Sequence, residues 1–234
     1  LKALRERTCD TRIGSICISR DSVGEYWASF SIASEEPFYK ALPKTNKKHG
    51  IDLNLLALVN TSDGHSLENR RYRRQTQTEL RKSQRKLSRM LEQAKKDKRS
   101  LRRSVNYQKQ RRKTAYIHRK VERRRTDYLH VLTKREIENQ DFIAAEDLKA
   151  SNMMKNHRLA NAIADASWRK FLTMLQYKAA LYDKTVVLVP PKNTTQTCSN
   201  CGYIMKGDER LTLKDRSWIC PQCKTLHERD INAA

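Results

Sequence analysis

Four cysteines near the C-terminal end constrain the fold of this 234-residue chain more than any other feature. They occur as two C-x-x-C pairs separated by 18 residues, namely Cys198, Cys201, Cys220 and Cys223. Within each pair one tight turn can bring both thiolates to a single ion, so the two pairs predict a tetrahedral four-sulfur zinc (Zn²⁺) site. Such a shell leaves no open position, which makes the ion structural. Two disulfides are the alternative.

Most of the formal net charge of +23 lies between residues 69 and 125, where 24 Lys and Arg residues stand against four acidic ones. Apolar residues recur there at helical spacing without proline or glycine, which predicts two long helices with a bend near residues 95–100. A charged helix face usually only contacts solvent, but such a face carries both acidic and basic residues, and here acidic residues are rare. We therefore expect phosphate-backbone contacts, for which the candidates are Arg81, Arg85, Arg89, Arg102 and Arg103.

A chain with this much positive charge is expected to bind a polyanionic partner, which is either nucleic acid or an anionic membrane. No run of eighteen apolar residues and no signal peptide is present, so nucleic acid is favoured over a membrane. The chain begins with Leu1 and ends with what reads as the opening of a helix, Asn232 to Ala234. We therefore expect a piece of a longer protein.

The rest of the chain predicts strands and one further helix. Residues 12–32 alternate apolar and polar side chains on both sides of the turn D-S-V-G-E, which indicates a hairpin. Apolar segments within residues 49–65, 141–148 and 185–191 predict buried strands. Residues 153–183 predict one amphipathic helix of roughly 25 residues, whose core positions would be Leu159, Ile163, Ala166, Phe171, Leu175 and Leu181.

Three acids near these strands are not explained by their local patterns. Asp52 lies between Ile51 and Leu53 in an apolar run, and burying it is costly unless it is paired or binds a metal. The alternative is that Asp52 faces solvent by simple alternation. Glu146 closes a later strand and Asp230 opens a terminal helix, so only the fold could gather the three.

The order strand, hairpin, helices, strand, helix, strand, helix is the one expected of a ribonuclease H-like nuclease domain. Three converging carboxylates are what two magnesium (Mg²⁺) ions need, because hard cations prefer oxygen ligands. The segments G-I-D-L-N-L-L-A-L, F-I-A-A-E-D-L, M-M-K-N-H-R-L-A, T-Q-T-C-S-N-C-G-Y and R-D-I-N-A-A then resemble the RuvC and zinc-ribbon half of the TnpB family. Its members are RNA-guided endonucleases of insertion sequences, related to type V CRISPR effectors.

The resemblance runs from residue 10 to the end and implies an α/β fold. This fold is a ribonuclease H-like (RuvC) mixed sheet with a long basic helical insertion, an inserted four-cysteine zinc ribbon and a short N-terminal β piece of wedge type. The implied divisions are residues 1–48 for the end of the wedge-type barrel and a linker, 49–190 for the nuclease core with its insertion at 69–139, 191–226 for the zinc ribbon, and 227–234 for the final RuvC segment.

The resemblance also implies a function. It places the catalytic, magnesium-binding triad at Asp52, Glu146 and Asp230, and it implies guide RNA and double-stranded DNA as partners in the cytoplasm of a bacterial or archaeal cell, associated with the nucleoid. We expect a magnesium-dependent DNA endonuclease that uses two metal ions. The alternative is a guide-RNA-directed DNA-binding protein that does not cleave, or a decayed transposon copy. One departure is Asn54, where the family usually has glycine, and we expect asparagine to tolerate a left-handed backbone there.

Overall fold

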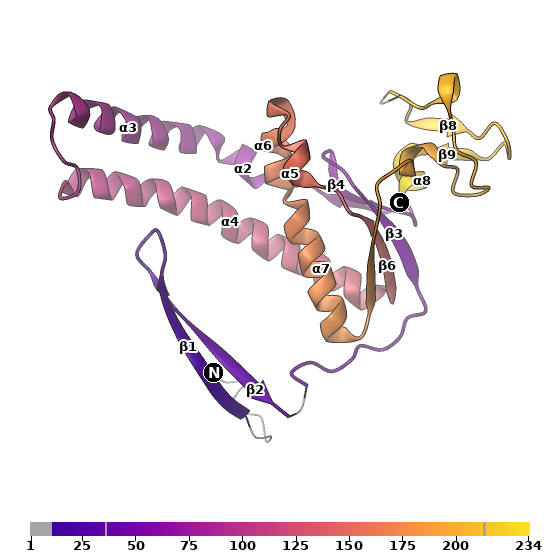
Figure 1. Cartoon of the computed structure of the whole chain (residues 1–234), viewed down its shortest axis with the longest axis horizontal. Coiled ribbons are helices and arrows are strands. Elements are labelled where there is room, and N and C mark those ends of the chain that lie inside the picture. The colour runs from indigo at the N-terminus through magenta and orange to yellow at the C-terminus, as the bar shows by residue number, and fades with distance from the viewer. Residues whose placement is uncertain (1–10, 36, 213) are drawn as a thin grey trace. The chain divides into compact units, whose positions relative to one another are not determined.

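The computed structural model describes residues 11–35, 37–212 and 214–234 (Figure 1). The chain forms two compact units. The first comprises residues 1–40 and 72–125, and the second comprises residues 41–71 and 126–234. Each unit is therefore built from segments that lie far apart in the sequence.

The first unit begins with the predicted hairpin. Strands β1 (Thr11–Arg20) and β2 (Tyr26–Ser34) pair antiparallel, with Arg20 opposite Tyr26 next to the turn. The turn is held by Asp21, whose Oδ1 accepts hydrogen bonds from the backbone N–H groups of residues 23, 24 and 25. Gly24 has a φ of +96°, which suits glycine. The local turn chemistry therefore fixes the register of the hairpin.

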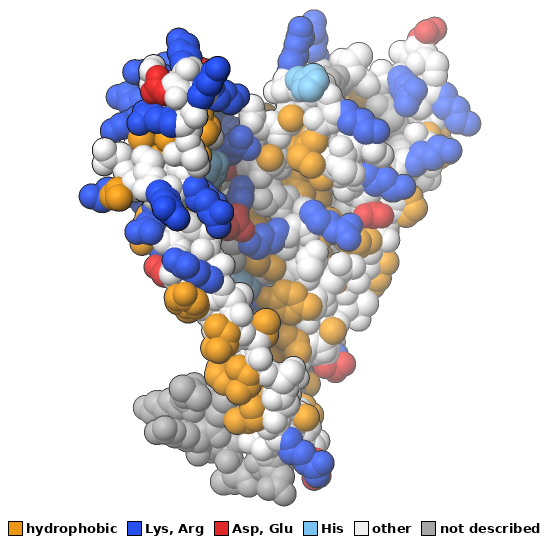
Figure 2. All heavy atoms as spheres, turned by 60° about the vertical axis from the view of Figure 1, so that its left-hand side comes forward, with side chains coloured by type: hydrophobic (Ala, Val, Ile, Leu, Met, Phe, Trp, Pro, Cys, Tyr) orange, Lys and Arg blue, Asp and Glu red, His pale blue; other side chains and the backbone are white. Residues whose placement is uncertain are grey.

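Two long helices follow in the first unit, as predicted. A short helix α2 (Tyr72–Gln75) leads into α3 (Gln77–Lys96), and α4 (Val105–Asn139) contributes its residues up to 125. Helix α3 stops within the predicted bend, near residues 95–100. On the face of the molecule seen in Figure 2, Lys and Arg side chains (blue) clearly outnumber Asp and Glu (red).

Polar side chains take part in the contact between α3 and α4. The hydroxyl groups of Ser83 and Thr114 lie 2.8 Å apart, and Gln110 Nε2 donates to Ser83 Oγ over 2.9 Å. All three residues are buried. The interface therefore depends on matched polar partners as well as on apolar contacts, which fixes how the two helices align.

The second unit contains a five-stranded mixed sheet with the order β5-β4-β3-β6-β7. Its strands are β3 (Lys48–Leu53), β4 (Ala57–Thr61), β5 (Ser66–Glu68), β6 (Phe142–Glu146) and β7 (Thr185–Val189). Strand β3 pairs antiparallel with β4 and parallel with β6, and β6 pairs parallel with β7. The expected mixed sheet is confirmed.

The predicted helix over residues 153–183 is wrong in one respect, because it is broken. The structure has α5 (Ala150–Met153), α6 (His157–Ala166) and α7 (Trp168–Tyr182), and the break lies at Ser167, whose φ of 54° and ψ of 40° are left-handed. Leu159 and Leu181 are exposed at 40% and 38%, against expectation, and Leu181 lies six positions after the buried Leu175, on a different face of α7. The other four predicted core positions are buried.

The core of the second unit lies between the sheet and its helices. The central strands contribute Ile51, Val59 and Ile143, and α7 contributes Phe171 and Leu175, all at most 1% exposed. The prediction that β7 is buried is wrong, because β7 is the edge strand and its Val187 is 40% exposed. An edge position also suits Pro190, which cannot donate to a sheet ladder.

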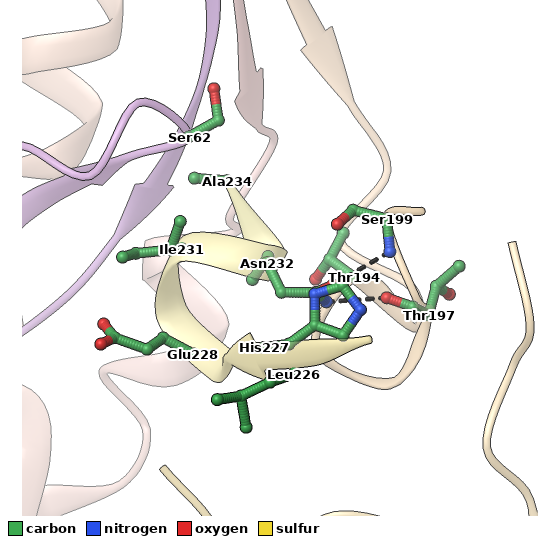
Figure 3. Close-up of a pocket in the computed structure, with 11 residues that line it drawn as sticks. Ser62, Thr194, Thr197, Ser199, Leu226, His227, Glu228, Ile231, Asn232 and Ala234 are labelled. Carbon is green, nitrogen blue, oxygen red and sulfur yellow. Dashed lines mark hydrogen bonds between the residues drawn. The ribbon is translucent and has the colours of Figure 1, made fainter. Parts of the chain in front are cut away.

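The ribbon follows β7 and ends the chain. It contains the 3₁₀ turns η1 (Thr194–Gln196) and η2 (Gly207–Glu209), the hairpin of β8 (Ser217–Ile219) with β9 (Leu226–Glu228), and then helix α8 (Arg229–Ala233). A cavity of about 640 Å³ lies beside α8 and β9, and Ser62 lines it from the sheet (Figure 3). No helix among the described residues is long and apolar enough to cross a membrane.

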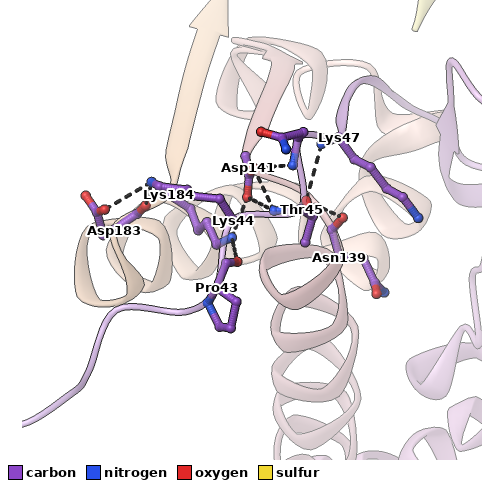
Figure 4. A network of polar contacts seen from close by, with 9 residues as sticks. Pro43, Lys44, Thr45, Lys47, Asn139, Asp141, Asp183 and Lys184 are labelled. Atoms are coloured by element: carbon purple, nitrogen blue, oxygen red, sulfur yellow. Dashed lines mark hydrogen bonds and ion pairs between the residues drawn. The ribbon is translucent and has the colours of Figure 1, made fainter.

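A polar network ties the segment before β3 to the starts of β6 and β7 (Figure 4). The carboxylate of Asp141 accepts hydrogen bonds from the backbone N–H groups of Thr45 and Asn46 and from the fully buried Lys184 ammonium. Lys184 also donates to the Pro43 carbonyl over 2.7 Å. These bonds, with that from Lys184 first, lower the pKa of Asp141. The network therefore anchors the incoming chain at the end of the sheet opposite the carboxyl ends of β3 and β6.

Candidate active site and metal centre

Asp52 and Glu146 come together at the carboxyl ends of two neighbouring strands. The parallel ladder of β3 and β6 runs to the pair Ile51 and Ala145, so the next residue of each strand is one of the two acids. Asp52 is 9% exposed and Glu146 is 6% exposed, so Asp52 does not face solvent. The parallel pairing of β3 with β6 thus brings together two acids that are 94 residues apart in the sequence.

Helix α8 brings the third acid near the other two, although the ligand atoms of the three acids do not form a group as tight as that of the cysteines. It lies against β3 and β4, and a Cβ atom built on Gly50 would fall 1.4 Å from the carbonyl oxygen of Ala234. Only glycine leaves room for this close approach of two backbones. Asp230 accepts a hydrogen bond at Oδ2 from Asn54 Nδ2 over 2.9 Å, and Asn54 directly follows β3.

The charges of the three acids affect one another. Burial, then the nearby charges of Glu146 and Asp230, raise the pKa of Asp52 to about 7, and Arg229 opposes this. Burial also raises the pKa of Glu146. The hydrogen bond that its carboxylate accepts from the hydroxyl of Thr194 has the smaller, opposite effect and lowers this pKa. The site therefore concentrates negative charge that a cation would stabilise.

Asn54 has a role that sequence reasoning missed. Its backbone φ is not positive, so Asn54 does not need the left-handed conformation that asparagine tolerates. Its Oδ1 accepts from the backbone N–H of Leu56 over 2.9 Å, which leaves Nδ2 as the donor to Asp230. The only signal in the sequence was the departure from glycine.

Two arginines near Asp230 were also missed. Arg229 donates to Asp230 Oδ1 from Nε and Nη2 over 3.3 and 3.2 Å, and Arg216 Nη1 lies 3.4 Å from Oδ2. Arg229 also donates to the carbonyl of Thr212 over 3.1 Å and is 9% exposed. Asp230 is thus oriented by groups on the ribbon side and by Asn54 on the sheet side.

The four cysteines form a cluster that fits a structural zinc ion. Their sulfur atoms all lie within 4.8 Å of one another, and within the described ranges no other His, Cys, Asp and Glu side chains form such a group. The closest Sγ pairs are 3.6 Å apart, far longer than a disulfide, so the disulfide alternative is wrong. His227 Nε2 lies 3.1 Å from Cys198 Sγ.

The predicted nucleic-acid contacts lie in the first unit and are all exposed. Arg81, Arg85 and Arg89 follow one face of α3 and line a shallow hollow together with Gln84, Ser88 and Glu92. Arg102 and Arg103 lie in the turn between α3 and α4. Three of the five arginines therefore form a continuous row, one helical turn apart.

The raised pKa of Asp52 predicts a pH-dependent response to magnesium. Below pH 7 Asp52 keeps its proton in the folded state, so without a divalent ion the free energy of unfolding falls as pH rises from 3.8 to about 7, by up to about 4 kcal/mol. A magnesium ion held by Asp52 would bind the ionised carboxylate, so its stabilising effect should grow over the same interval. We expect a larger rise in melting temperature on adding magnesium at about pH 8 than at about pH 6.

Asp52→Asn is the matched variant for this measurement. It should be more stable than the unsubstituted protein at the higher pH without magnesium, and it should respond weakly to magnesium at both pH values. Equal responses of the two proteins to magnesium would contradict a role for Asp52 in binding the ion.

Two family models match the chain. The model OrfB_IS605, described as "Probable transposase", matches residues 29–157, and a model described as "Cas12f1-like, TNB domain" matches residues 168–234. The first covers Asp52 and Glu146, and the second covers Asp230 and all four ribbon cysteines.

Several relatives are also similar. A Streptomyces pristinaespiralis protein named as an RNA-guided DNA endonuclease is 34% identical over 221 residues, which are 94% of this chain and 51% of that protein. The similarly named InsQ of Escherichia coli K12 is 29% identical over 228 residues, and the match covers 91% of this chain and 53% of that protein. A solved Cas12f1–sgRNA–target DNA complex contains a chain that is similar with a TM-score of 0.47 and 18% identity. The match covers 94% of this chain and 54% of that chain. The chain spans about half the length of these relatives.

Proposed function

Because the chain belongs to the OrfB_IS605 family of probable transposases, we propose that it is the nuclease part of an RNA-guided, magnesium-dependent DNA endonuclease. Its catalytic residues are Asp52, Glu146 and Asp230. One observation carries the proposal: two buried acids end neighbouring parallel strands, and a third returns to them from the end of the ribbon. The two buried acids are costly unless they are paired or bind a cation, and the half-buried Asp230 is already paired with arginines.

The donor set fits magnesium. All three side chains offer carboxylate oxygens, the ligands that this hard ion prefers, and burial together with repulsion from Glu146 and Asp230 raises the pKa of Asp52. The chemistry that magnesium would supply there is activation of the attacking water and stabilisation of the leaving 3′ oxygen of the DNA backbone. Asp52, Glu146 and Asp230 would hold the magnesium ions.

The neighbouring residues of this chain orient the acids. The Thr194 hydroxyl holds one oxygen of Glu146, and the Asn54 amide holds one oxygen of Asp230. Arg229 and Arg216 hold Asp230 through charged hydrogen bonds, which are stronger than neutral ones. Asp52 must lose its proton before it binds a cation, so its raised pKa sets the pH at which the site becomes competent.

The remaining expectations are part of the same proposal. The sheet of the second unit is a RuvC-like core, the helices over residues 69–139 are its basic insertion, and the N-terminal hairpin is the end of a wedge-type barrel. Guide RNA and double-stranded DNA are the partners. The relatives from Streptomyces pristinaespiralis and Escherichia coli are named as RNA-guided DNA endonucleases, and these names support the assignment.

The experiment that tests the proposal is plasmid cleavage by the full-length protein, purified together with RNA from its own locus. Cleavage that requires both magnesium and the RNA would support the nuclease. RNA-dependent DNA binding without cleavage, under conditions where an active relative cuts its own target, would instead support a guided DNA-binding protein. Binding that does not depend on the RNA would contradict both.

The row of arginines on α3 predicts a change in salt dependence. Replacing Arg85 and Arg89 by glutamine should weaken nucleic-acid binding and lower the slope of log affinity against log salt by about one for each phosphate that is no longer neutralised. The matched control replaces Lys82 and Lys86 by glutamine, which removes the same charge from another face of α3. Filter binding over a range of salt concentrations measures both slopes. An unchanged slope in the arginine variant would exclude this face as a nucleic-acid surface.

A further inference from the structure

The side chain of Asn232 joins helix α8 to the first zinc knuckle. Its Oδ1 accepts a hydrogen bond from the backbone N–H of Ser199 over 2.9 Å, and its Nδ2 donates to the backbone carbonyl of Thr197 over 2.7 Å (Figure 3). These two backbone groups lie on either side of Cys198 in the sequence. A backbone N–H can only donate and a carbonyl can only accept, so the orientation of the amide is unambiguous.

Helix α8 needs such an anchor. It has five residues, too few for a helix to be stable in isolation, so its position depends on contacts with the rest of the chain. Asp230 lies within it, two residues before Asn232. On the other side of Asp230, His227 Nε2 lies 3.1 Å from Cys198 Sγ. The segment that carries Asp230 therefore contacts the first knuckle at both of its ends.

The two knuckles differ at the position that makes this contact. Ser199 follows the first cysteine of one knuckle, and Pro221 follows the first cysteine of the other. Proline has no N–H, so the second knuckle cannot donate the equivalent hydrogen bond. The chain thus shows that a C-x-x-C turn forms with either residue, and that the tie to α8 is an addition to the first knuckle.

We propose that Asn232 is a positioning residue that fixes α8, and through it Asp230, to the zinc knuckle. The order of the third carboxylate then depends on zinc binding, although the cysteines do not take part in the cleavage chemistry. This inference rests on the catalytic role proposed for Asp230. Removing a group that orients a metal ligand typically costs about 10- to 100-fold in metal affinity or activity.

Two variants break the tie from opposite sides. Asn232→Ala removes both hydrogen bonds, and Ser199→Pro removes only the N–H donor while keeping a knuckle sequence that the second pair already uses. Asn200→Ala is the matched control. It removes an amide of the same knuckle, which donates to Thr225 Oγ1 over 3.0 Å and to Cys223 Sγ over 3.6 Å, and neither of these partners belongs to α8.

Hydrogen exchange of residues 230–234, which follow the β8–β9 pairing, gives a readout in the full-length protein that does not depend on activity. In the unsubstituted protein and in Asn200→Ala, we expect protection that disappears when a chelator removes zinc. In Asn232→Ala and Ser199→Pro, these amides should exchange rapidly even with one zinc ion bound per chain. Unchanged protection in both variants, or loss of their zinc, would overturn the proposal.

Cleavage by the same full-length proteins then tests the consequence for Asp230. The magnesium concentration for half-maximal cleavage should rise about 10-fold or more in Asn232→Ala and Ser199→Pro, with DNA affinity unchanged. Asp230→Ala separates the two hypotheses. If it cleaves normally, the proposed triad fails. If it is inactive while both tie variants cleave at the magnesium concentrations of the unsubstituted protein, only the role of Asn232 fails.

Discussion

The full-length protein carrying Asp52→Ala is expected to lose plasmid cleavage by at least about a thousandfold, which corresponds to roughly 4 kcal/mol of transition-state stabilisation. The reason is that Asp52 lies at the centre of the acidic site, where burial and its two acidic neighbours raise its pKa to about 7. Glu146→Ala should behave in the same way. Affinity for the guide RNA and DNA should change little, because these acids make few contacts with a nucleic-acid backbone.

Asp147→Ala is the control for this experiment. Asp147 follows Glu146 directly, but it lies just beyond the end of β6 and is less buried than Glu146. It should cleave at close to the unsubstituted rate. A large loss of nucleic-acid binding in Asp52→Ala, or equal damage from Asp147→Ala, would argue against the catalytic assignment.

Cys198→Ser is expected to release the zinc ion and to unfold the ribbon. Structural zinc sites contribute on the order of 10 kcal/mol to the folding of small domains, and Cys198 is only 1% exposed at the centre of this one. Its neighbours Trp218 and Met205 should lose their packing, and the segment that carries Asp230 should become disordered. Zinc content and the fluorescence of Trp218 measure the two effects.

Cys17→Ser is the matched control, since Cys17 is exposed and lies outside the cluster. It should bind one zinc ion per chain and keep its fluorescence. A Cys198→Ser protein that remained folded in the ribbon and cleaved DNA would show that the ribbon is dispensable for the activity.

Features with a short-range physical cause could be predicted from the sequence. The hairpin turn could be predicted from residues such as Asp21, whose side chain accepts hydrogen bonds from nearby backbone N–H groups. The cysteine cluster could be predicted from the spacing of the cysteines alone. The long basic helices followed from periodicity. Asp52 and Glu146 were singled out as acids that their local patterns do not explain, and the family resemblance implied that they form one site; the structure places them next to each other on paired strands.

Features that depend on the tertiary fold were not predicted. The break at Ser167 lies between two strongly helical segments, and nothing local marks a serine for a left-handed conformation. The exposure of β7 depends on which strand ends the sheet, and its own composition does not reveal that. Asn54 and Asn232 look like ordinary polar residues until the fold brings each to a partner more than thirty residues away.

The parallel pairing of β3 with β6 also bears on how such a chain could diversify. The register that aligns Ile51 with Ala145 depends on the two strands themselves and not on the length of what connects them. Insertions or deletions within α3 and the facing part of α4 can therefore accumulate without shifting the two acids against each other, provided that the helices change by matched lengths. The segment proposed to contact nucleic acid and the proposed site of chemistry would then be free to evolve at different rates within one gene.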